Sequence, residues 1–461
     1  MGIASSLFFS NDGEKQTLWR RVRPTDEQFE EQRARWNDLG DHLMQDLEDR
    51  SGVRVSSWLQ GSYKFGTQVR PVRKGLEFDI DLGVYFRWRG EPEDGGHGAE
   101  DLRRMVQASL QAYAARTGAV IEVVEPPKAR CSRVRFEGDF HIDVPVYHLK
   151  AVDDQRALAL LDGGWEDSDP KAIYLWFKER FDDYTRFKVR RQVQYLKNWA
   201  LRTLGDDGPS SILITTLVAL EHPRLCSAES EADDEALRAL AGRLADRLEQ
   251  NPKVPNPVAP GEDLNRMSAA QTDTFVGKLR GLEDIGARAL RAADRVEAAE
   301  IWSEAFGHFF PVSDEMIGEG AGVRASAAQV VPIRFDPDIV VEATPKGSSR
   351  SFTGRNTIGP IPKNCDIVFR VVNPIELPRG ATIRWVVRNE GEEAEGLNDL
   401  GHPAGHGLVA EERSAYRGRH FMDATVWLDG RLIGRRRVPV VIQGMAMPSR
   451  AAARPAWTQL R

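Results

Sequence analysis

Three aspartates on two short apolar stretches have the type and spacing of metal ligands. Asp79 and Asp81 lie in the stretch FDIDL, and Asp143 lies with His141 in the later stretch FHIDV. Side chains of a strand alternate between its two faces, so each stretch places apolar residues on one face and carboxylates on the other. Carboxylates that converge repel one another unless a cation lies among them, and oxygen ligands suit Mg²⁺ or Mn²⁺. The pattern predicts a two-metal site for phosphoryl transfer.

A glycine and a serine precede the first acidic stretch. Gly61 and Ser62 follow an apolar run that contains Val55, Trp58 and Leu59. A glycine lets the backbone approach a phosphate closely, and the neighbouring N–H groups and serine hydroxyl can donate hydrogen bonds to its oxygens. An isolated Gly-Ser pair is most often a turn, and an isolated Asp-x-Asp strand is most often a solvated sheet face. Their occurrence together, in this order, favours a site for a triphosphate.

The elements that must position these residues are predicted to form a small α/β core. A helix is expected from Pro24 to about Asp49, lying lengthwise on the sheet, and a second helix is expected over 101–117. A turn over 137–139 joins the stretch 134–136 to the third acidic strand as a hairpin. The apolar residues of the first helix recur at helical spacing: Phe29, Trp36, Leu39, Leu43 and Leu47.

The middle of the chain is predicted to be helical. From Asp169 to about Pro311, apolar residues recur at intervals of three and four. The stretch 206–209 breaks the helices, and Ser210-Ser211 can cap a following helix over 212–220. The Pro-rich stretch 251–264 is predicted to be a loop.

The last third of the chain is predicted to be a small all-β sandwich. After about Val323, apolar stretches of strand length alternate with Asn-Pro, Pro-Arg-Gly and Asp-Gly turns. The predicted strands are 367–372, 382–387, 424–428 and 437–442. The residues over 444–461 are rich in Ala, Arg and Pro, so we expect a disordered tail.

Composition limits the class of protein. A chain of 461 residues is expected to form two or three domains. Cys131, Cys226 and Cys365 have neither disulfide nor zinc-ligand spacing, which favours a cytoplasmic location. We find no apolar run that could span a bilayer and no signal peptide, so no membrane partner is expected. The net charge of −6 gives no bulk attraction to nucleic acid.

The order of these motifs resembles the nucleotidyltransferase superfamily of DNA polymerase beta, in which a Gly-Ser pair precedes Asp-x-Asp and a third aspartate. More narrowly, residues 20 to 312 resemble the bacterial cGAS/DncV-like nucleotidyltransferases of SMODS type, the CD-NTases. The stretches that carry this resemblance are LQGSYKFGT, EFDIDLGVYF, HIDVPVYH, WEDSDPKAIYLWF and RRQVQYLKNWA. The resemblance implies a mixed-sheet nucleotidyltransferase core with an N-terminal spine helix over 1–165, and an α-helical lobe over 166–322.

The resemblance also implies roles for particular residues. The implied catalytic residues, which would hold two Mg²⁺ or Mn²⁺ ions, are Asp79, Asp81 and Asp143. The implied nucleotide-binding residues are Gln60, Gly61, Ser62, Lys197 and Ser211. For Lys197 the alternative is a surface lysine that extends to solvent, and for Ser211 it is an ordinary helix N-cap.

The implied activity is synthesis of a cyclic di- or trinucleotide from NTPs, ATP among them. In the family such a product acts as a second messenger on a separate effector protein in antiphage (CBASS-type) signalling. Three alternatives remain open: a related nucleotidyltransferase with linear or conjugated products, a catalytically silent ligand sensor, and an enzyme gated by an activating protein or nucleic-acid ligand. The intact triad argues against the silent sensor.

Residues 328–443 resemble the AGS-C domain, a proposed sensor behind some of these nucleotidyltransferases. The resemblance rests on Asn373-Pro374, Gly391, Ala394 and the stretches WVVRN and YRGRH. Aromatic and cationic side chains there either stack on and pair with a ligand, or fill and fringe the sandwich. These side chains are Trp385, Arg388, Tyr416, Arg417, Arg419 and His420.

Overall fold

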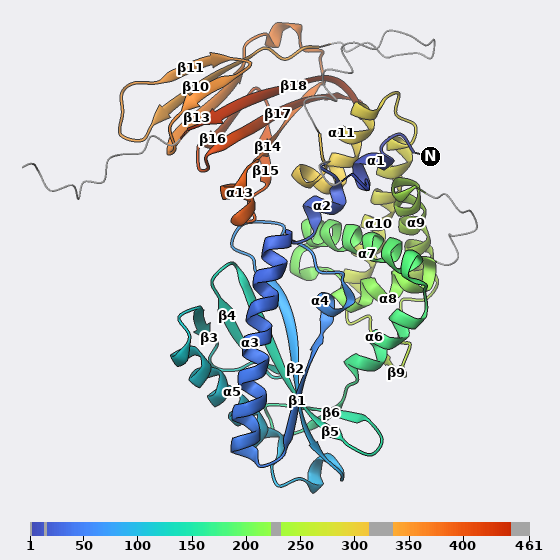
Figure 1. The fold of residues 1–461 in the computed structure, drawn as a ribbon. Helices are drawn as coiled ribbons and strands as arrows, with labels where there is room; N and C mark the ends of the chain where they lie inside the picture. Colours follow the sequence, from blue (N-terminus) through green and yellow to red (C-terminus); the bar gives the residue numbers. More distant parts are fainter. Residues whose placement is uncertain (1, 13–15, 223–231, 313–334, 444–461) are drawn as a thin grey trace, which may run out of the picture. The chain divides into compact units, whose positions relative to one another are not determined.

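The structure is a computed structural model, shown in Figure 1. It describes residues 2–12, 16–222, 232–312 and 335–443. The chain divides into two compact units, residues 1–328 and 329–461. The predicted tail, 444–461, lies outside the described residues, and the predicted boundary at residue 165 stays a prediction. Among the described helices, none is both long enough and apolar enough to cross a membrane.

A seven-stranded mixed sheet lies at the centre of the first unit. Its order is β1-β2-β5-β4-β3, and β6 and β7 extend from β5. β2 and β5 run parallel, whereas β1 pairs with β2, and β4 with β5, in antiparallel fashion. The strands are β1 (Arg54–Gln60), β2 (Phe78–Trp88), β3 (Val120–Val123), β4 (Cys131–Phe136), β5 (Phe140–Lys150), β6 (Gln155–Ala159) and β7 (Trp165–Asp167).

Two helices, α3 (Asp26–Ser51) and α5 (Ala99–Arg116), cover one face of this sheet (Figure 1). α3 begins with a capping box between Thr25 and Gln28 and ends at Gly52, whose φ of 69° suits the left-handed cap. The even-numbered residues Phe78–Leu82 of β2 and Phe140–Val144 of β5 form a buried core with both helices. The apolar faces are therefore in phase, as predicted, and the odd-numbered acidic residues point to the opposite side.

The rest of the first unit is mostly helical. Ser210 caps α8 by accepting a hydrogen bond from the Leu213 N–H. The stretch predicted as a loop, 251–264, contains a small hairpin of β8 (Pro255–Asn256) and β9 (Ala259–Asp263). The helices are α1 (Ser5–Phe8), α2 (Leu18–Val22), α4 (Gly61–Phe65), α6 (Pro170–Glu179), α7 (Asp183–Leu204), α8 (Ser211–Glu221), α9 (Asp233–Gln250), α10 (Ala269–Ala289) and α11 (Arg295–Phe306).

The second unit is a β-sandwich, which confirms the predicted fold class. One sheet has the order β11-β10-β13-β16 and the other β12-β18-β17-β14-β15. Apolar residues from both sheets meet in one buried core around Trp385 and Phe369. The elements are β10 (Ile339–Pro345), β11 (Phe352–Arg355), β12 (Ile358–Ile361), β13 (Cys365–Val371), β14 (Thr382–Arg388), α13 (Glu392–Gly396), β15 (Gly401–His406), β16 (Val409–Arg413), β17 (Gly418–Leu428) and β18 (Arg431–Ile442).

Candidate active site

The parallel pairing of β2 and β5 brings the three aspartates together. Asp81 lies opposite Asp143 in the register, and Asp79 lies opposite His141. One carboxylate oxygen each from Asp79 and Asp143 and one ring nitrogen of His141 lie within 4.8 Å of one another. Two carboxylates and an imidazole at this spacing can ligate a divalent cation.

Asp81 is the carboxylate of this site whose charged form the surroundings disfavour. Burial, followed by the negative charges of Asp79 and Asp143, raises the pKa of Asp81 to about 8, although Arg133 and Lys197 partly oppose the shift. A divalent cation at this position would compensate the charge that burial and the neighbouring carboxylates disfavour. The donor set therefore fits a hard divalent ion such as Mg²⁺ or Mn²⁺.

Asp143 is held by two basic residues that the sequence motifs did not indicate. Arg133 donates from Nε to Asp143 Oδ1 and from Nη2 to Asp143 Oδ2, the latter at 2.8 Å, and Lys128 Nζ lies 3.4 Å from Oδ2. Burial alone would raise the pKa of Asp143, but the hydrogen bonds and charge of Arg133, with Lys128, lower it below its ordinary value. Asp143 is therefore ionised before any metal binds.

His141 connects Asp79 to a second ion-pair network. His141 Nε2 lies 2.9 Å from Asp79 Oδ1, and His141 Nδ1 lies 2.9 Å from Glu77 Oε2. Arg135 Nε in turn donates to Glu77 Oε1 at 2.7 Å. Strand parity placed His141 on this face, but no sequence signal connected it with Glu77.

Gly61 lies directly against Asp81. It is the first residue of α4, directly after β1, and has a φ of 58°; a Cβ atom at this position would lie 1.9 Å from Asp81 Oδ2. Only glycine combines this backbone conformation with that close approach. Ser62 is the next residue of α4 and is partly buried. The Gly-Ser pair therefore lies beside the acidic site, and phosphate binding by Gly61 and Ser62 stays a prediction.

Replacing Gly61 with alanine should lower the turnover rate by about a hundredfold, because the new Cβ displaces Asp81. The control is Gly52→Ala, since Gly52 has a φ of 69° and a Cβ atom there would meet no other atom within 4 Å. Both variants carry the strain of a non-glycine residue in the left-handed region, about 1 kcal/mol. Thermal melting and initial rates separate the effects: equal rate losses in the two variants would contradict the contact with Asp81.

Gln60 ends β1 in a buried position, with its side chain between two tyrosines. Its Nε2 donates to the Tyr85 hydroxyl at 2.7 Å, and its Oε1 accepts from the Tyr147 hydroxyl at 3.2 Å. The amide therefore bonds to neighbouring strands of the sheet. Nucleotide binding by Gln60 stays a prediction.

Lys197 lies on the inner face of α7 and points to the segment between α4 and β2. It is 4% exposed and donates to the Thr67 carbonyl oxygen at 2.9 Å. Burial lowers the pKa of Lys197 to about 8, while the charges of Asp79 and Asp81 act in the opposite direction. It is thus not a solvent-extended surface lysine.

Ser211 is the exposed first residue of α8, and its neighbour Ser210 provides the cap. The helix itself contacts α4, which begins at Gly61. Triphosphate contacts by Lys197 and Ser211 stay predictions.

Comparisons with known proteins agree with this geometry. A family model described as "Cyclic GMP-AMP synthase DncV-like, nucleotidyltransferase domain" matches residues 55–147, and one described as "Adenylyl/Guanylyl and SMODS C-terminal sensor domain" matches residues 324–443. A cyclic GMP-AMP synthase from Escherichia albertii is 27% identical over 450 residues, which are 95% of this chain and 96% of that one. The chain therefore contains a DncV-like nucleotidyltransferase domain and, after it, a region that matches a C-terminal sensor domain.

More distant relatives match smaller parts of the chain. A c-di-GMP synthase from Roseivirga ehrenbergii is 26% identical over 275 residues, or 54% of this chain and 68% of that one. A mutant of the Vibrio cholerae di-nucleotide cyclase DncV, solved with ATP and GTP, has a TM-score of 0.58 at 21% identity over 68% of this chain and 99% of that one. The same enzyme with the linear intermediate 5' pppA(3',5')pG has a TM-score of 0.56 at 22% identity over 68% of this chain and 98% of that one. The similarity to these structures supports the nucleotidyltransferase fold of the part of the chain that they match.

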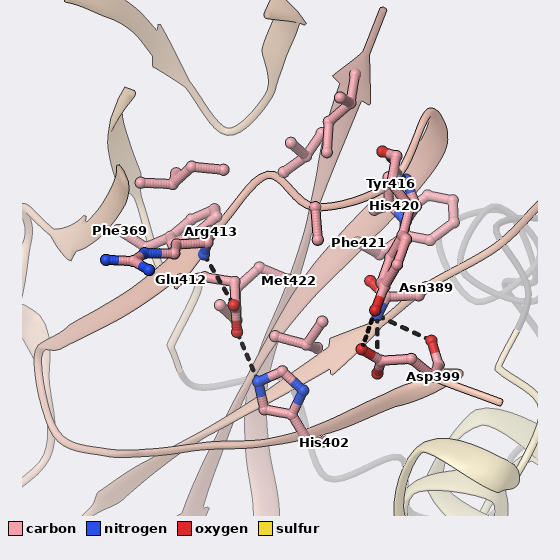
Figure 2. A pocket seen from close by; sticks show the side chains of 15 residues that line it. Phe369, Asn389, Asp399, His402, Glu412, Arg413, Tyr416, His420, Phe421 and Met422 are labelled. Carbon is pink, nitrogen blue, oxygen red and sulfur yellow. Dashed lines mark hydrogen bonds and ion pairs between the residues drawn. The ribbon is translucent and has the colours of Figure 1, made fainter. Parts of the chain in front are cut away.

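The residues predicted to contact a ligand in the second unit are mostly internal. Trp385 is 1% exposed and donates from Nε1 to the Gly407 carbonyl oxygen, and Arg388 pairs with the buried Asp423. Tyr416 and His420 are also buried, although both line a small cavity between the sheets (Figure 2). Trp385 and Arg388 therefore belong to the structure of the sandwich, which favours the second of the two alternatives for them.

Two polar contacts between segments of the sandwich are made by residues that line that cavity. His402 on β15 pairs with Glu412 on β16 at 2.6 Å, and the Tyr416 hydroxyl donates to Asp399 at 2.6 Å (Figure 2). Most of the other lining residues are apolar, among them Phe369 and Met422. Because β15 and β16 belong to different sheets, the pair of His402 and Glu412 holds the two sheets together at one edge.

Proposed function

We propose that this nucleotidyltransferase joins nucleotides from NTP donors into a cyclic di- or trinucleotide. The observation that carries the proposal is the in-register meeting of Asp81 and Asp143 beside the backbone of Gly61. Such a site can hold a metal-bound triphosphate next to the ribose hydroxyl of a second nucleotide. The relative that matches 95% of the chain is a cyclic GMP-AMP synthase, which supports a cyclic product here.

The acidic residues have complementary tasks in this proposal. Asp79, Asp81 and Asp143 would hold two divalent cations, Mg²⁺ or Mn²⁺. Bound there, such ions would neutralise the charge of the donor triphosphate and would lower the pKa of the attacking ribose hydroxyl. Arg133 keeps Asp143 ionised and fixes its orientation through two hydrogen bonds.

The basic and small residues orient the donor. The backbone of Gly61 and the hydroxyl of Ser62 hold the phosphates in line with the attacking oxygen, and Lys197 supplies positive charge. The ribose oxygen bonds to the α-phosphorus, the bond to the bridging oxygen breaks, and pyrophosphate leaves with the electron pair while the hydroxyl proton passes to solvent. After one such transfer for a dinucleotide, or two for a trinucleotide, a final transfer within the linear product closes the ring and releases the last pyrophosphate.

The product distinguishes this activity from its competitors. The full chain is incubated with all four NTPs and Mg²⁺ or Mn²⁺, then with phosphatase, and the surviving nucleotide is identified by mass. Leaving out one NTP at a time identifies the bases. We expect a phosphatase-resistant cyclic product. Nucleotides joined to a protein or a small acceptor would instead identify a conjugating nucleotidyltransferase.

Metal affinity should depend on pH because the partly buried carboxyl of Asp81 competes for a proton. In the ion-free fold the pKa of Asp81 is about 8, which is above the ordinary value of 3.8 that an aspartate has in the unfolded chain. The ion-free fold therefore loses stability as the pH rises from the unfolded pKa to the folded pKa. A cation must displace this proton below about pH 8, so the apparent affinity for Mn²⁺ should rise by up to about tenfold per pH unit from about pH 6 to 8. Calorimetric titration measures it. Equal affinities at both ends of the range would contradict the assignment of Asp81.

We also propose that the product acts on a separate effector protein in antiphage defence, with the second unit controlling synthesis. Removing the chain after about residue 325 should leave a folded enzyme, because 99% of the DncV chain matches only 68% of this one. We expect the basal rate of the shortened enzyme to change and its response to the activating or inhibiting ligand to disappear. A shortened enzyme that responds like the full chain would place the sensor elsewhere.

A further inference from the structure

A cavity of about 370 Å³ lies in the first unit, between the start of α3, the end of α4 and the helix α7. Its lining does not include the three aspartates of the acidic site. Four of its lining residues are aromatic, and two more are arginines that face it from different elements. The six residues are Trp19, Phe29, Tyr63, Phe187, Arg23 and Arg190.

Of the two arginines that line this cavity, Arg190 is the one without a protein partner among the described residues. Arg23 pairs with Asp26, whereas Arg190 makes no hydrogen bond or ion pair with any residue that the structure describes. Its Nε is buried against Gly66, where a Cβ atom would lie 3.1 Å away. Burial and then the charge of Arg186 lower the pKa of Arg190 from its ordinary value. A guanidinium in this setting gains most from an added anion.

The aromatic walls are held in place before any ligand binds. Phe29 stacks on Tyr63 with ring centroids 4.9 Å apart, yet 40% of Phe29 remains exposed. Trp19 donates from Nε1 to Gln194 Oε1 at 2.9 Å, and Arg23 lies 4.6 Å from the centre of its ring. Exposed aromatic surface next to an unpaired cation recognises a planar ring that carries an anionic group.

The same face of α7 connects this cavity with the acidic site. Arg190, Gln194 and Lys197 recur at helical spacing, and Gln194 Nε2 donates to the Gln68 carbonyl oxygen at 3.0 Å. Gln68 Nε2 then donates to the Asp79 carbonyl oxygen at 3.2 Å. The segment over 66–68 therefore lies between the cavity and the strand that carries Asp79.

We propose that this cavity binds a small anion with a planar ring, of about the size of a mononucleotide. Arg190 pairs with the anionic group, and Phe29 and Trp19 flank the ring. Binding fixes the segment 66–68 and, through Gln68, changes the rate at the acidic site. The binding itself is independent of the proposed function, whereas the change in rate rests on it.

Flavin mononucleotide is the first probe, because stacking on aromatic rings quenches its fluorescence and riboflavin is the same ring without the phosphate. AMP and GMP are tested by competition. The experiment uses the full chain and its Asp79→Asn/Asp81→Asn variant, in which binding at the acidic site is impaired. Arg190→Gln removes the cation, and Lys188→Gln removes one equal charge from α7 outside the cavity lining. If Arg190→Gln fails to fold, Phe29→Leu replaces it as the test, because it removes one of the aromatic rings that flank the ligand.

We expect flavin mononucleotide to bind the double-aspartate variant as well as the native chain, and riboflavin to bind about tenfold more weakly. Arg190→Gln should weaken binding by about tenfold and Lys188→Gln by less than about twofold. No binding of any of the three phosphates, or equal binding by Arg190→Gln, would overturn the site. A bound probe that leaves the initial rate unchanged would overturn the coupling. Binding without any nucleotidyl transfer would refute only the proposed function.

Discussion

Replacing both Asp79 and Asp81 with asparagine should abolish synthesis, with a fall in rate of at least about 10³-fold, because the loss of both carboxylates removes several kcal/mol of metal-based stabilisation. The fold should remain, because asparagine is uncharged. The substitution therefore removes both the cost of burying a carboxylate and its repulsion by the neighbouring carboxylates, the two effects that raise the pKa of Asp81. Initial rates and thermal melting in the absence of metal test both statements.

The matched control for this variant removes the same charge elsewhere. Asp41 and Asp49 are exposed on α3, so Asp41→Asn/Asp49→Asn changes the net charge equally without touching the acidic site. The control should keep a rate within about twofold of the native chain, as expected for solvent-exposed groups. A double variant of Asp79 and Asp81 that turns over at a comparable rate would show that the site has been wrongly assigned.

Asp143→Asn should reduce kcat by about a hundredfold while leaving the dissociation constant of the donor NTP within about threefold. In the proposed division of tasks, Asp79 and Asp81 hold both ions, and Asp143 completes the position of the ion that activates the attacking hydroxyl. The donor therefore still binds in the Asp143 variant. Binding of a non-hydrolysable NTP and single-turnover rates separate the two quantities.

The stability of this variant is measured at the same time. Asp143 accepts two hydrogen bonds from Arg133, so its replacement should cost about 1–3 kcal/mol of folding free energy. The variant is therefore assayed well below its melting temperature. An equal loss of NTP affinity in Asp143→Asn and in the double variant would contradict the division of tasks between the carboxylates.

Strand parity was enough to predict the carboxylate face of the sheet. Period-two alternation places Asp79, Asp81 and Asp143 opposite the buried residues of the same strands, and the structure has this arrangement. The hairpin predicted between 134–136 and Phe140 also exists, and its register pairs Arg133 with Asp143. The partner of Asp143 could thus have been predicted by counting back along that hairpin.

Other parts of the site depend on contacts between segments that are distant in sequence. His141 meets Glu77, which precedes β2, and Lys197 reaches Thr67 from a helix of the predicted lobe. Local spacing carries no information about which loop a buried lysine will meet, because that depends on how the lobe packs on the core. The same holds for Arg190 over Gly66, and for Trp385, whose burial follows from the packing of two sheets.

The phosphate-to-nucleoside ratio of the phosphatase-resistant product tests the central claim most directly. A cyclic oligonucleotide has one internal phosphate for each nucleoside and no end that phosphatase can attack, so intact mass after phosphatase treatment should give a ratio of one. A linear product loses its terminal phosphates and gives a ratio below one. A ratio of one, absent from the Asp79→Asn/Asp81→Asn variant, is the predicted result; a ratio below one with the native chain would contradict ring closure.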